Sequence, residues 1–361
     1  MIAGPPCKHP GMRNSILLAL LAPLVLAAST AAPADSAPAA AGAAYTVRSL
    51  PLPGANDDGI FMDYIAFDPH TGFVWAPAGN TGAVDVVDTA TGKVTQISGF
   101  PTTEVEVRGR KRTIGPSSVT VGDRVVYVGN RADSTVCAVD ARSLVRGACG
   151  RLDSMPDGLA YVAPTKELWV TTPRDKSVRI LDGATLAQKA KLSFDGQPEG
   201  FAVDAARGRF YTNLEDKDRT LAIDLQSHQT VATWNPKCGE EGPHGLRIDE
   251  KGGLLFVACS TRTEALDAGH DGAVLSSVDT GDGVDDLDYA PARHLLYVGA
   301  ARAGKLTVAR VDGRGKLTVV AQVPTREGAR NGVVVKDGTV YLAHASTPKS
   351  NDLLVVSPSP K

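Results

Sequence analysis

Short stretches of alternating apolar and polar residues, separated by Gly, Pro and Asp, run along the chain from about residue 45 to its end. Residues 158–194 show the pattern clearly, with GLAYVAP, ELWVTT, SVRILD and KAKLSF in succession. Alternation with a period of two residues is typical of strands with one buried face, and the residues between the stretches favour turns. The pattern therefore predicts a unit of four strands, which we call a to d.

The unit repeats along the chain, and two independent series of positions keep step with it. The segments MPDGLAYV (155–162), QPEGFAVD (197–204) and GPHGLRID (242–249) share Pro, Gly and apolar positions but vary the polar residue between Pro and Gly. This variable position falls at Asp63, Ser117, Asp157, Glu199, His244, Asp285 and Asn331. The second series is an Asp that ends strand c, at Asp88, Asp140, Asp182, Asp224, Asp267 and Asp312. Two agreeing series establish an internal repeat of about 40 residues.

Seven four-stranded units predict an all-β fold, a seven-bladed β-propeller, in which closure of the ring hides the sheet edges. The seventh unit begins at Asn331 and has room for strands a, b and c only, with LLVVS (353–357) as strand c. We predict that YTVRSLPL (45–52) supplies the missing strand d, so that the first strand completes the last blade. The propeller is expected to span residues 44–361.

Two stretches, VVYVGNRADSTVCAVDARSL (125–144) and VDVVDTATGKV (84–94), resemble the YVTN-repeat β-propeller family. The resemblance covers all seven units and implies the propeller fold. The shorter stretches PDGLAYV and RNGVVV (330–335) also resemble turns of the gluconolactonase and senescence-marker propellers. This local resemblance implies a divalent-metal lactonase, although those enzymes use a Glu on the first blade, where this chain has Asp63.

The variable positions are expected to line the central channel, because strand a is the innermost strand of a propeller blade. Blades 3 to 6 then contribute an arc of Asp157, Glu199, His244 and Asp285. Oxygen ligands with one imidazole suit Ca²⁺, Mn²⁺ or Zn²⁺, and a bound metal would polarise a carbonyl or activate water. These four residues are therefore candidate metal ligands or catalytic groups. The alternative is a channel that holds water or faces a substrate without a metal.

Basic side chains are expected at the same mouth, because the loops between strands b and c open there. The candidate ligand-binding residues of the mouth are Asp63, Ser117, Asn331, Arg131, Arg174, Arg262, Arg302, Arg330 and His344. Guanidinium groups bind carboxylates and phosphates through two parallel hydrogen bonds, so the arginines favour a small anionic ligand. Alternatively, they are solvated loop charges that pair with nearby acids.

The first 43 residues are predicted to lie outside the propeller. Lys8 and Arg13 precede ILLALLAPLVLAA (16–28), which is too short for a membrane span and has the length of a signal-peptide core. We predict a signal peptide at 1–28, an Ala/Pro-rich linker at 29–43, and a periplasmic or secreted mature chain without a membrane span.

The mature chain keeps four cysteines, and export would place them in an oxidising compartment. Cys137 and Cys149 lie on strands c and d of the second unit and would face each other across a hairpin. Cys238 and Cys259 both belong to the fifth unit, near the channel mouth. We predict disulfides within these two pairs; a reduced Cys/His metal site is the alternative.

Charge and motifs leave three functions open. Lys and Arg number 38 against 40 Asp and Glu, so no global charge demands a nucleic acid or an anionic membrane. Motifs for a nucleophile elbow, a zincin or a c-type haem are missing from the sequence. The first prediction is a monomeric binding or scaffold protein that takes a small ligand or metal in its channel. The alternatives are a metal-dependent lactonase-type hydrolase, and a platform for a protein or single-stranded nucleic acid that uses the basic insertion EVEVRGRKR (104–112).

Overall fold

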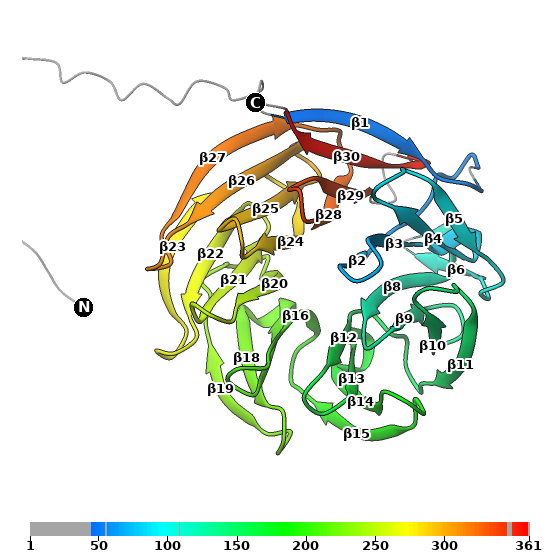
Figure 1. Cartoon of the computed structure of the whole chain (residues 1–361). Helices are drawn as coiled ribbons and strands as arrows, with labels where there is room; N and C mark the ends of the chain where they lie inside the picture. Colours follow the sequence, from blue (N-terminus) through cyan, green and yellow to red (C-terminus); the bar gives the residue numbers. More distant parts are fainter. Residues whose placement is uncertain (1–44, 55, 108, 345–348, 360–361) are drawn as a thin grey trace, which may run out of the picture. The chain divides into compact units, whose positions relative to one another are not determined.

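The computed structural model describes residues 45–359, except 55, 108 and 345–348. Within these residues, seven four-stranded antiparallel sheets surround a central channel, as Figure 1 shows. The predicted seven-bladed β-propeller is therefore confirmed. No helix in this part of the chain reaches the length and apolar character that a bilayer span requires.

The strands of a blade follow the chain from the channel outward. Blade 1 contains β2 (Ala66–Asp68), β3 (Phe73–Ala78), β4 (Ala83–Asp88) and β5 (Val94–Ile97). Blade 2 contains β8 (Pro116–Val121), β9 (Val125–Asn130), β10 (Thr135–Asp140) and β11 (Arg146–Arg151). Blade 3 contains β12 (Leu159–Val162), β13 (Glu167–Thr172), β14 (Ser177–Asp182) and β15 (Gln188–Ser193). Blade 4 contains β16 (Pro198–Asp204), β17 (Arg209–Leu214), β18 (Arg219–Asp224) and β19 (Thr230–Trp234); blade 5 contains β20 (Pro243–Asp249), β21 (Leu254–Cys259), β22 (Arg262–Asp267) and β23 (Ala273–Asp279). Blade 6 contains β24 (Val284–Ala290), β25 (Leu295–Ala300), β26 (Lys305–Val311) and β27 (Leu317–Pro324).

Blade 7 closes the ring with strands from both ends of the described chain. It contains β28 (Ala329–Val334), β29 (Val340–His344), β30 (Asp352–Pro358) and, as its outermost strand, β1 (Tyr45–Pro51). β1 and β30 pair antiparallel along their whole length, from Tyr45 opposite Pro358 to Pro51 opposite Asp352. The predicted completion of the last blade by the first strand is confirmed.

Additional short elements lie at loops of the ring. The insertion between blades 1 and 2 forms a hairpin of β6 (Thr103–Val107) and β7 (Arg110–Ile114). Loops between the second and third strands contain the 3-10 turns η2 (Gly79–Thr81), η3 (Pro173–Asp175) and η4 (Glu215–Lys217). The hairpin and the turns matter for function because they contribute side chains to the channel mouth.

The core lies between neighbouring blades rather than within one sheet. Every residue of β13 is buried, whereas the outermost strand β15 of the same blade is largely exposed. Trp169 of β13 packs on Phe210 of the next blade, with ring centroids 4.7 Å apart. Middle strands are buried on both faces because each blade is covered by its two neighbours. Their residues are therefore nearly all apolar or hydrogen-bonded.

The repeating Asp at the end of strand c forms the turn into strand d. Asp182 is typical, since its Oδ1 accepts backbone hydrogen bonds from Ala184 (3.1 Å) and Thr185 (2.9 Å). These hydrogen bonds, with one from the Thr185 hydroxyl, lower the pKa of Asp182 below its usual value. The same turn occurs at Asp88, Asp140, Asp224, Asp267 and Asp312. The series therefore marks Asx turns, which Asp favours because its side chain bonds to its own backbone.

Both predicted disulfides are present. Cys137 and Cys149 are joined across β10 and β11, where they are directly opposite in the strand register. Cys238, in the loop that enters blade 5, is joined to Cys259 at the end of β21. The second disulfide ties that loop to the strand beside it.

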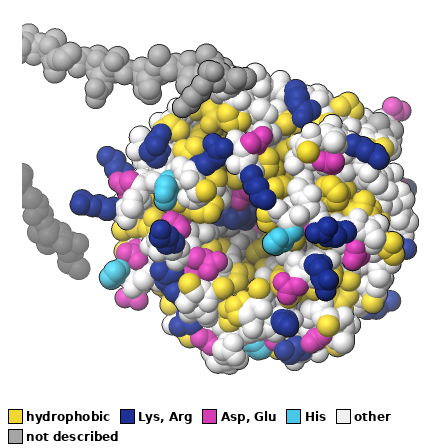
Figure 2. All heavy atoms as spheres, in the orientation of Figure 1, with side chains coloured by type: hydrophobic (Ala, Val, Ile, Leu, Met, Phe, Trp, Pro, Cys, Tyr) yellow, Lys and Arg dark blue, Asp and Glu magenta, His cyan; other side chains and the backbone are white. Residues whose placement is uncertain are grey.

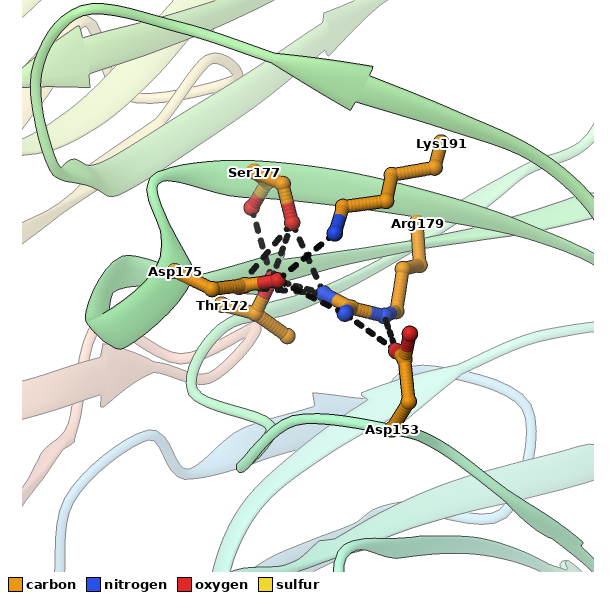
Figure 3. A network of polar contacts seen from close by, with 6 residues as sticks. All are labelled: Asp153, Thr172, Asp175, Ser177, Arg179 and Lys191. Atoms are coloured by element: carbon orange, nitrogen blue, oxygen red, sulfur yellow. Dashed lines mark hydrogen bonds and ion pairs between the residues drawn. The ribbon is translucent and has the colours of Figure 1, made fainter.

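A buried arginine holds the loop of blade 3 that bears η3 (Figure 3). The side chain of Arg179 has no exposed area, and its guanidinium pairs with Asp153 and Asp175 and donates hydrogen bonds to Ser177 and Thr172. Burial by itself would raise the pKa of Asp175, but hydrogen bonds from Arg179 and neighbouring groups outweigh it and hold that pKa far below its usual value. The network stabilises the turn that lies next to the channel mouth.

Candidate functional site

A β-bulge occurs at the variable position in five of the seven blades. In blade 4, Pro198 pairs with Leu214 and Phe201 pairs with Thr212, so Glu199 and Gly200 lie opposite a single residue. Equivalent shifts occur in β8, β20, β24 and β28. Because a bulge interrupts the alternation of side chains, it re-aims the residue that it contains. This explains how these five blades present one polar side chain at the start of the innermost strand.

Glycines beside the variable positions let neighbouring innermost strands approach closely. A Cβ on Gly200 would lie 2.1 Å from the carbonyl oxygen of His244, and one on Gly245 would lie 2.2 Å from Oδ1 of Asp286. Neither position has space for a side chain. The glycines that follow the variable residues are therefore needed where adjacent blades meet around the channel.

One cavity at the mouth contains three guanidinium groups, and we call it the arginine cavity. It has a volume of about 280 Å³, and its polar lining residues include Asp63, Arg112, Ser117, Arg131 and Arg330. Arg112 comes from β7 of the inserted hairpin, and its guanidinium lies 4.7 Å from the ring centroid of Phe61. Three blades and the insertion thus converge on one cavity.

Two of the arginines are paired with acids of the ring. Arg131 contacts Asp63 (Nη2–Oδ2 2.8 Å) and also Asp157. Arg330 contacts Asp285 (Nη1–Oδ1 2.9 Å) and lies 3.5 Å from Asp63. These pairs join residues of blades 1, 2, 3, 6 and 7, so the predicted convergence of these side chains is observed.

Arg112 has no ion pair among the described residues. Burial lowers its pKa, and the neighbouring positive charges of Arg131 and Arg330 contribute to the shift. Its Nε, the Nε of Arg330 and the Oγ of Ser117 are buried and lack a hydrogen-bond partner in the described part of the chain. The arginine cavity therefore holds donors that the protein itself leaves unused.

A second cavity adjoins the first and shares Arg112, Ile114 and Arg131 with it. We call it the acidic cavity, since its lining also includes Asp157, Glu199 and Glu215, and its volume is about 330 Å³. Arg174 of η3 lies at the same cavity. The channel is open at the centre of the ring, and Figure 2 shows the hollow on one face.

The carboxyl group of Glu199 is in an unusual environment. It makes no hydrogen bond or ion pair with any described residue, although the side chain is half-buried. Burial raises its pKa well above the usual range, and the negative charges of Asp157 and Glu215 raise it further. Burial likewise raises the pKa of Asp157, against the opposing effect of Arg131.

The channel continues below these cavities into an apolar chamber of about 460 Å³ lined by the innermost strands of all seven blades. Tyr64 and Phe201 line this chamber, with their ring centroids 5.8 Å apart. Arg247 also lines it and pairs with Asp286 (3.0 Å) and Asp288 (3.2 Å). The polar mouth and the apolar chamber thus form two chemically different parts of one channel.

Some of the predicted mouth residues make their contacts outside the two cavities. Arg262 pairs with Glu264 (2.6 Å) in its own strand, and the exposed Arg302 binds Asp282 through two hydrogen bonds of 2.7 and 2.6 Å. His344 is fully buried and accepts a hydrogen bond from Arg326 (3.1 Å). None of the three predicted residues lines the arginine cavity or the acidic cavity.

The remaining members of the ring have clear partners. Asn331 donates a hydrogen bond to Asp63 (3.0 Å). His244 contacts Ser260 (Nε2–Oγ 3.2 Å), and its Nδ1 lies 4.0 Å from Glu215. Burial lowers the pKa of His244, which favours its neutral form.

The four candidate metal ligands do not form a common cluster in the structure. Among the described residues, no group of three or more His, Cys, Asp and Glu side chains is arranged to hold a metal ion. Asp157 and Asp285 instead contact Arg131 and Arg330. Metal binding at these residues stays a prediction from sequence.

Sequence reasoning did not place two residues in the site. Arg112 was noted only as part of a basic insertion, and Glu215 was not singled out although it lies in a loop between strands b and c, like other predicted mouth residues. Arg112 enters on an insertion that the other units lack, whereas Glu215 begins η4, a turn whose equivalents in blades 1 and 3 begin with Gly79 and Pro173. In the sequence, only the charges of the two segments that contain Arg112 and Glu215 indicated that these residues could contribute to the site.

The chain matches no protein-family model and no curated protein sequence. Solved structures do match: a chain of the mitotic checkpoint complex is 16% identical with a TM-score of 0.69, covering 94% of this chain and 100% of that one. Virginiamycin B lyase from Staphylococcus aureus is 11% identical with a TM-score of 0.67, covering 87% and 100%. The WD40 repeats of RRP9 are 10% identical with a TM-score of 0.67, covering 87% and 97%.

These similarities show a shared propeller fold. At such low identity they carry no function across, because one fold supports many unrelated activities. Membership of the YVTN-repeat family stays a prediction.

Proposed function

We propose that this propeller binds a small anionic ligand at the mouth of its central channel and acts as a binding protein. The observation that carries the proposal is the arginine cavity, where three guanidinium groups meet and Arg112 lacks an acidic partner among the described residues. Charged donors in a partly dehydrated cavity form stronger hydrogen bonds than donors in water. A carboxylate or phosphate would accept hydrogen bonds from the terminal guanidinium nitrogens of Arg112, which bond to no described residue.

The architecture supports a binding role. Arg131 and Arg330 are held by ion pairs to ring acids, so their guanidinium groups are oriented before a ligand arrives. The rest of the site is supplied by strand ends and by the inserted hairpin. Such preorganisation lowers the entropy cost of binding.

The test is isothermal titration calorimetry of the full chain with butanoate and with inorganic phosphate. Arg112→Gln should weaken binding of the anion by about tenfold or more, because a charged hydrogen bond contributes on the order of 1.5–3 kcal/mol. Arg302→Gln is the matched control, since Arg302 is exposed at 59% of its side chain and lies outside the cavity. The proposal is wrong if neither anion binds with a Kd below about 10 mM, or if both variants lose affinity equally.

The alternative of a metal-dependent lactonase has its own test. Elemental analysis would compare the chain purified without chelator with a Glu199→Gln, His244→Ala double variant. Near-stoichiometric metal that disappears in a folded double variant would establish the metal site and justify a screen of lactones and esters. Absence of metal from both would remove the lactonase alternative.

The inserted hairpin also bears on the third prediction, a platform for other macromolecules. Its Arg112 lies over Phe61 and lines the cavity, and its Lys111 pairs with Glu104 (2.7 Å). Of these two groups only Arg112 lies at the channel site, whereas the Lys111–Glu104 pair is exposed to solvent. This supports a role for the hairpin in the channel site.

A further inference from the structure

The arginine cavity and the acidic cavity are two halves of one site, and the carboxylates are concentrated in the second half. Arg112, Ile114 and Arg131 line both cavities, so the cavities are in direct contact. The arginine cavity is lined by Arg112, Arg131 and Arg330 with one carboxylate, Asp63. The acidic cavity is lined by the carboxylates Asp157, Glu199 and Glu215 with Arg112, Arg131 and Arg174. A ligand that occupies both halves would experience a strong gradient of charge across a short distance.

The acidic half holds acceptor atoms that the protein does not satisfy. Asp157 is only 7% exposed, and its Oδ2 is buried and lacks a hydrogen-bond partner in the described chain, while Oδ1 contacts Arg131. Glu199 has no hydrogen bond or ion pair with a described residue. Buried acceptors without partners are costly, and they are usually completed by a ligand or by water.

The nearby basic groups do not complete this half. Arg131 already contacts two carboxylates, and Arg330 contacts Asp285 and Asp63. His244 lies 4.0 Å from Glu215 and contacts Ser260. Arg112 and Arg174 also line this half, but neither they nor Arg131 forms an ion pair with Glu199, so the Glu199 carboxyl group has no positive partner among the described residues.

We propose that the ligand is a zwitterion of the amino-acid class, with its carboxylate in the arginine cavity and its ammonium group in the acidic cavity against Asp157 and Glu199. The inference rests on the proposed anion-binding function and adds the second charged group. An ammonium group has three donors, which match carboxylate oxygens that lack partners. Because Arg112 and Arg131 line both cavities, the carboxylate and the ammonium group of the ligand must be close together, as in a small amino acid.

The test compares molecules that differ by one charged group. Calorimetry of the full chain would use glycine, 3-aminopropanoate, 4-aminobutanoate and 5-aminopentanoate, each against its deaminated acid and its decarboxylated amine. At least one amino acid should bind ten or more times as tightly as both of its analogues, a difference of about 1.4 kcal/mol.

Variants separate the two halves. Glu199→Gln should reduce the advantage of the amino acid over its deaminated acid to about threefold or less, with little change for the acid itself. Glu215→Gln, at the half-buried residue across the cavity, should produce a smaller loss in the same direction. Arg112→Gln should weaken both molecules together. The thermal unfolding midpoint of each variant checks that it is folded.

The possible failures are distinguishable. If the deaminated acid binds as tightly as the amino acid, the zwitterion inference is wrong and anion binding stands. If neither binds, the zwitterion inference is wrong, and if inorganic phosphate does not bind either, the anion-binding proposal is wrong as well. If Ca²⁺ binds, is lost in Glu199→Gln, and no amino acid is preferred, the acidic cavity is a cation site and the inference is overturned.

Discussion

Replacement of Gly200 by Ala would test whether close approach of the innermost strands builds the channel mouth. The added Cβ would lie 2.1 Å from the carbonyl oxygen of His244 and 2.5 Å from the Cα of Gly245. Both atoms belong to the backbone of the next blade, so no side-chain rotation relieves the overlap. The strands of blades 4 and 5 must move apart.

The expected cost is about 3 kcal/mol, the upper part of the range for overpacking in a closely packed interior. An unfolding entropy of roughly 2.1 cal/mol/K per residue gives about 0.65 kcal/mol/K for about 310 ordered residues. The unfolding midpoint should therefore fall by about 5 °C in differential scanning calorimetry. Binding at the mouth should weaken as well, because Glu199 adjoins the substituted position.

Gly313→Ala is the matched control. A Cβ there meets no atom within 4 Å, and Gly313 does not adopt a positive φ. The unfolding midpoint of Gly313→Ala should not fall, because the added Cβ meets no atom and Ala reduces the conformational entropy of the unfolded chain. A Gly200→Ala midpoint within about 1 °C of the control would refute the packing argument.

Three further predictions concern stability. Arg179→Met should lower the free energy of unfolding by about 3 kcal/mol in urea denaturation, because it removes the guanidinium from Asp175, which keeps Lys191 as its ionic partner, and takes a donor from the buried hydroxyls of Thr172 and Ser177; a loss below about 1 kcal/mol would contradict this. Burial lowers the pKa of His344 to about 4, so the neutral form stabilises the fold above about pH 6.5 and this contribution is lost as the pH falls toward 4. His344→Gln should flatten the stability profile in that window, and an unchanged slope would count against it. The Cys238–Cys259 disulfide joins residues that are 21 positions apart, and its removal in a double Cys→Ala variant should lower the free energy of unfolding by about 3 kcal/mol in the same assay. Wild-type stability in that variant would argue against a constraining role of the disulfide.

The fold was predictable because its signals are local and repeated. Alternating residues define each strand, and the Asp of each turn into strand d bonds to backbone groups two or three residues away. The shortened seventh unit and the unassigned first strand together predicted the ring closure that β1 and β30 make. The disulfide between Cys137 and Cys149 followed from the same hairpin register.

The candidate site was predictable only in part. The repeat placed polar residues at the start of the innermost strands, and the structure joins Asp63, Asp157 and Asp285 through arginines. The repeat did not indicate the bulges or the choice of partners. Arg262 and Arg302 carry the same charge as Arg131, but Arg262 pairs with Glu264 of its own strand and Arg302 with Asp282 of the loop that enters blade 6.

The sequence by itself predicted the number of blades and their strand order, because these depend on periodicity within about 50 residues. It predicted the closure because the seventh unit lacks a fourth strand and the first strand is left over. The cysteine pairs were a choice among three possible pairings, which the structure decided. Only the tertiary structure decided which charges meet. Arg131 and Asp63 are 68 positions apart, and Arg330 and Asp63 are 267 apart. Their contacts depend on how the ring closes and where the inserted hairpin lies, and a local pattern contains neither. The same geometry places Arg112 beside the acidic cavity and makes the mouth a site with two charged halves.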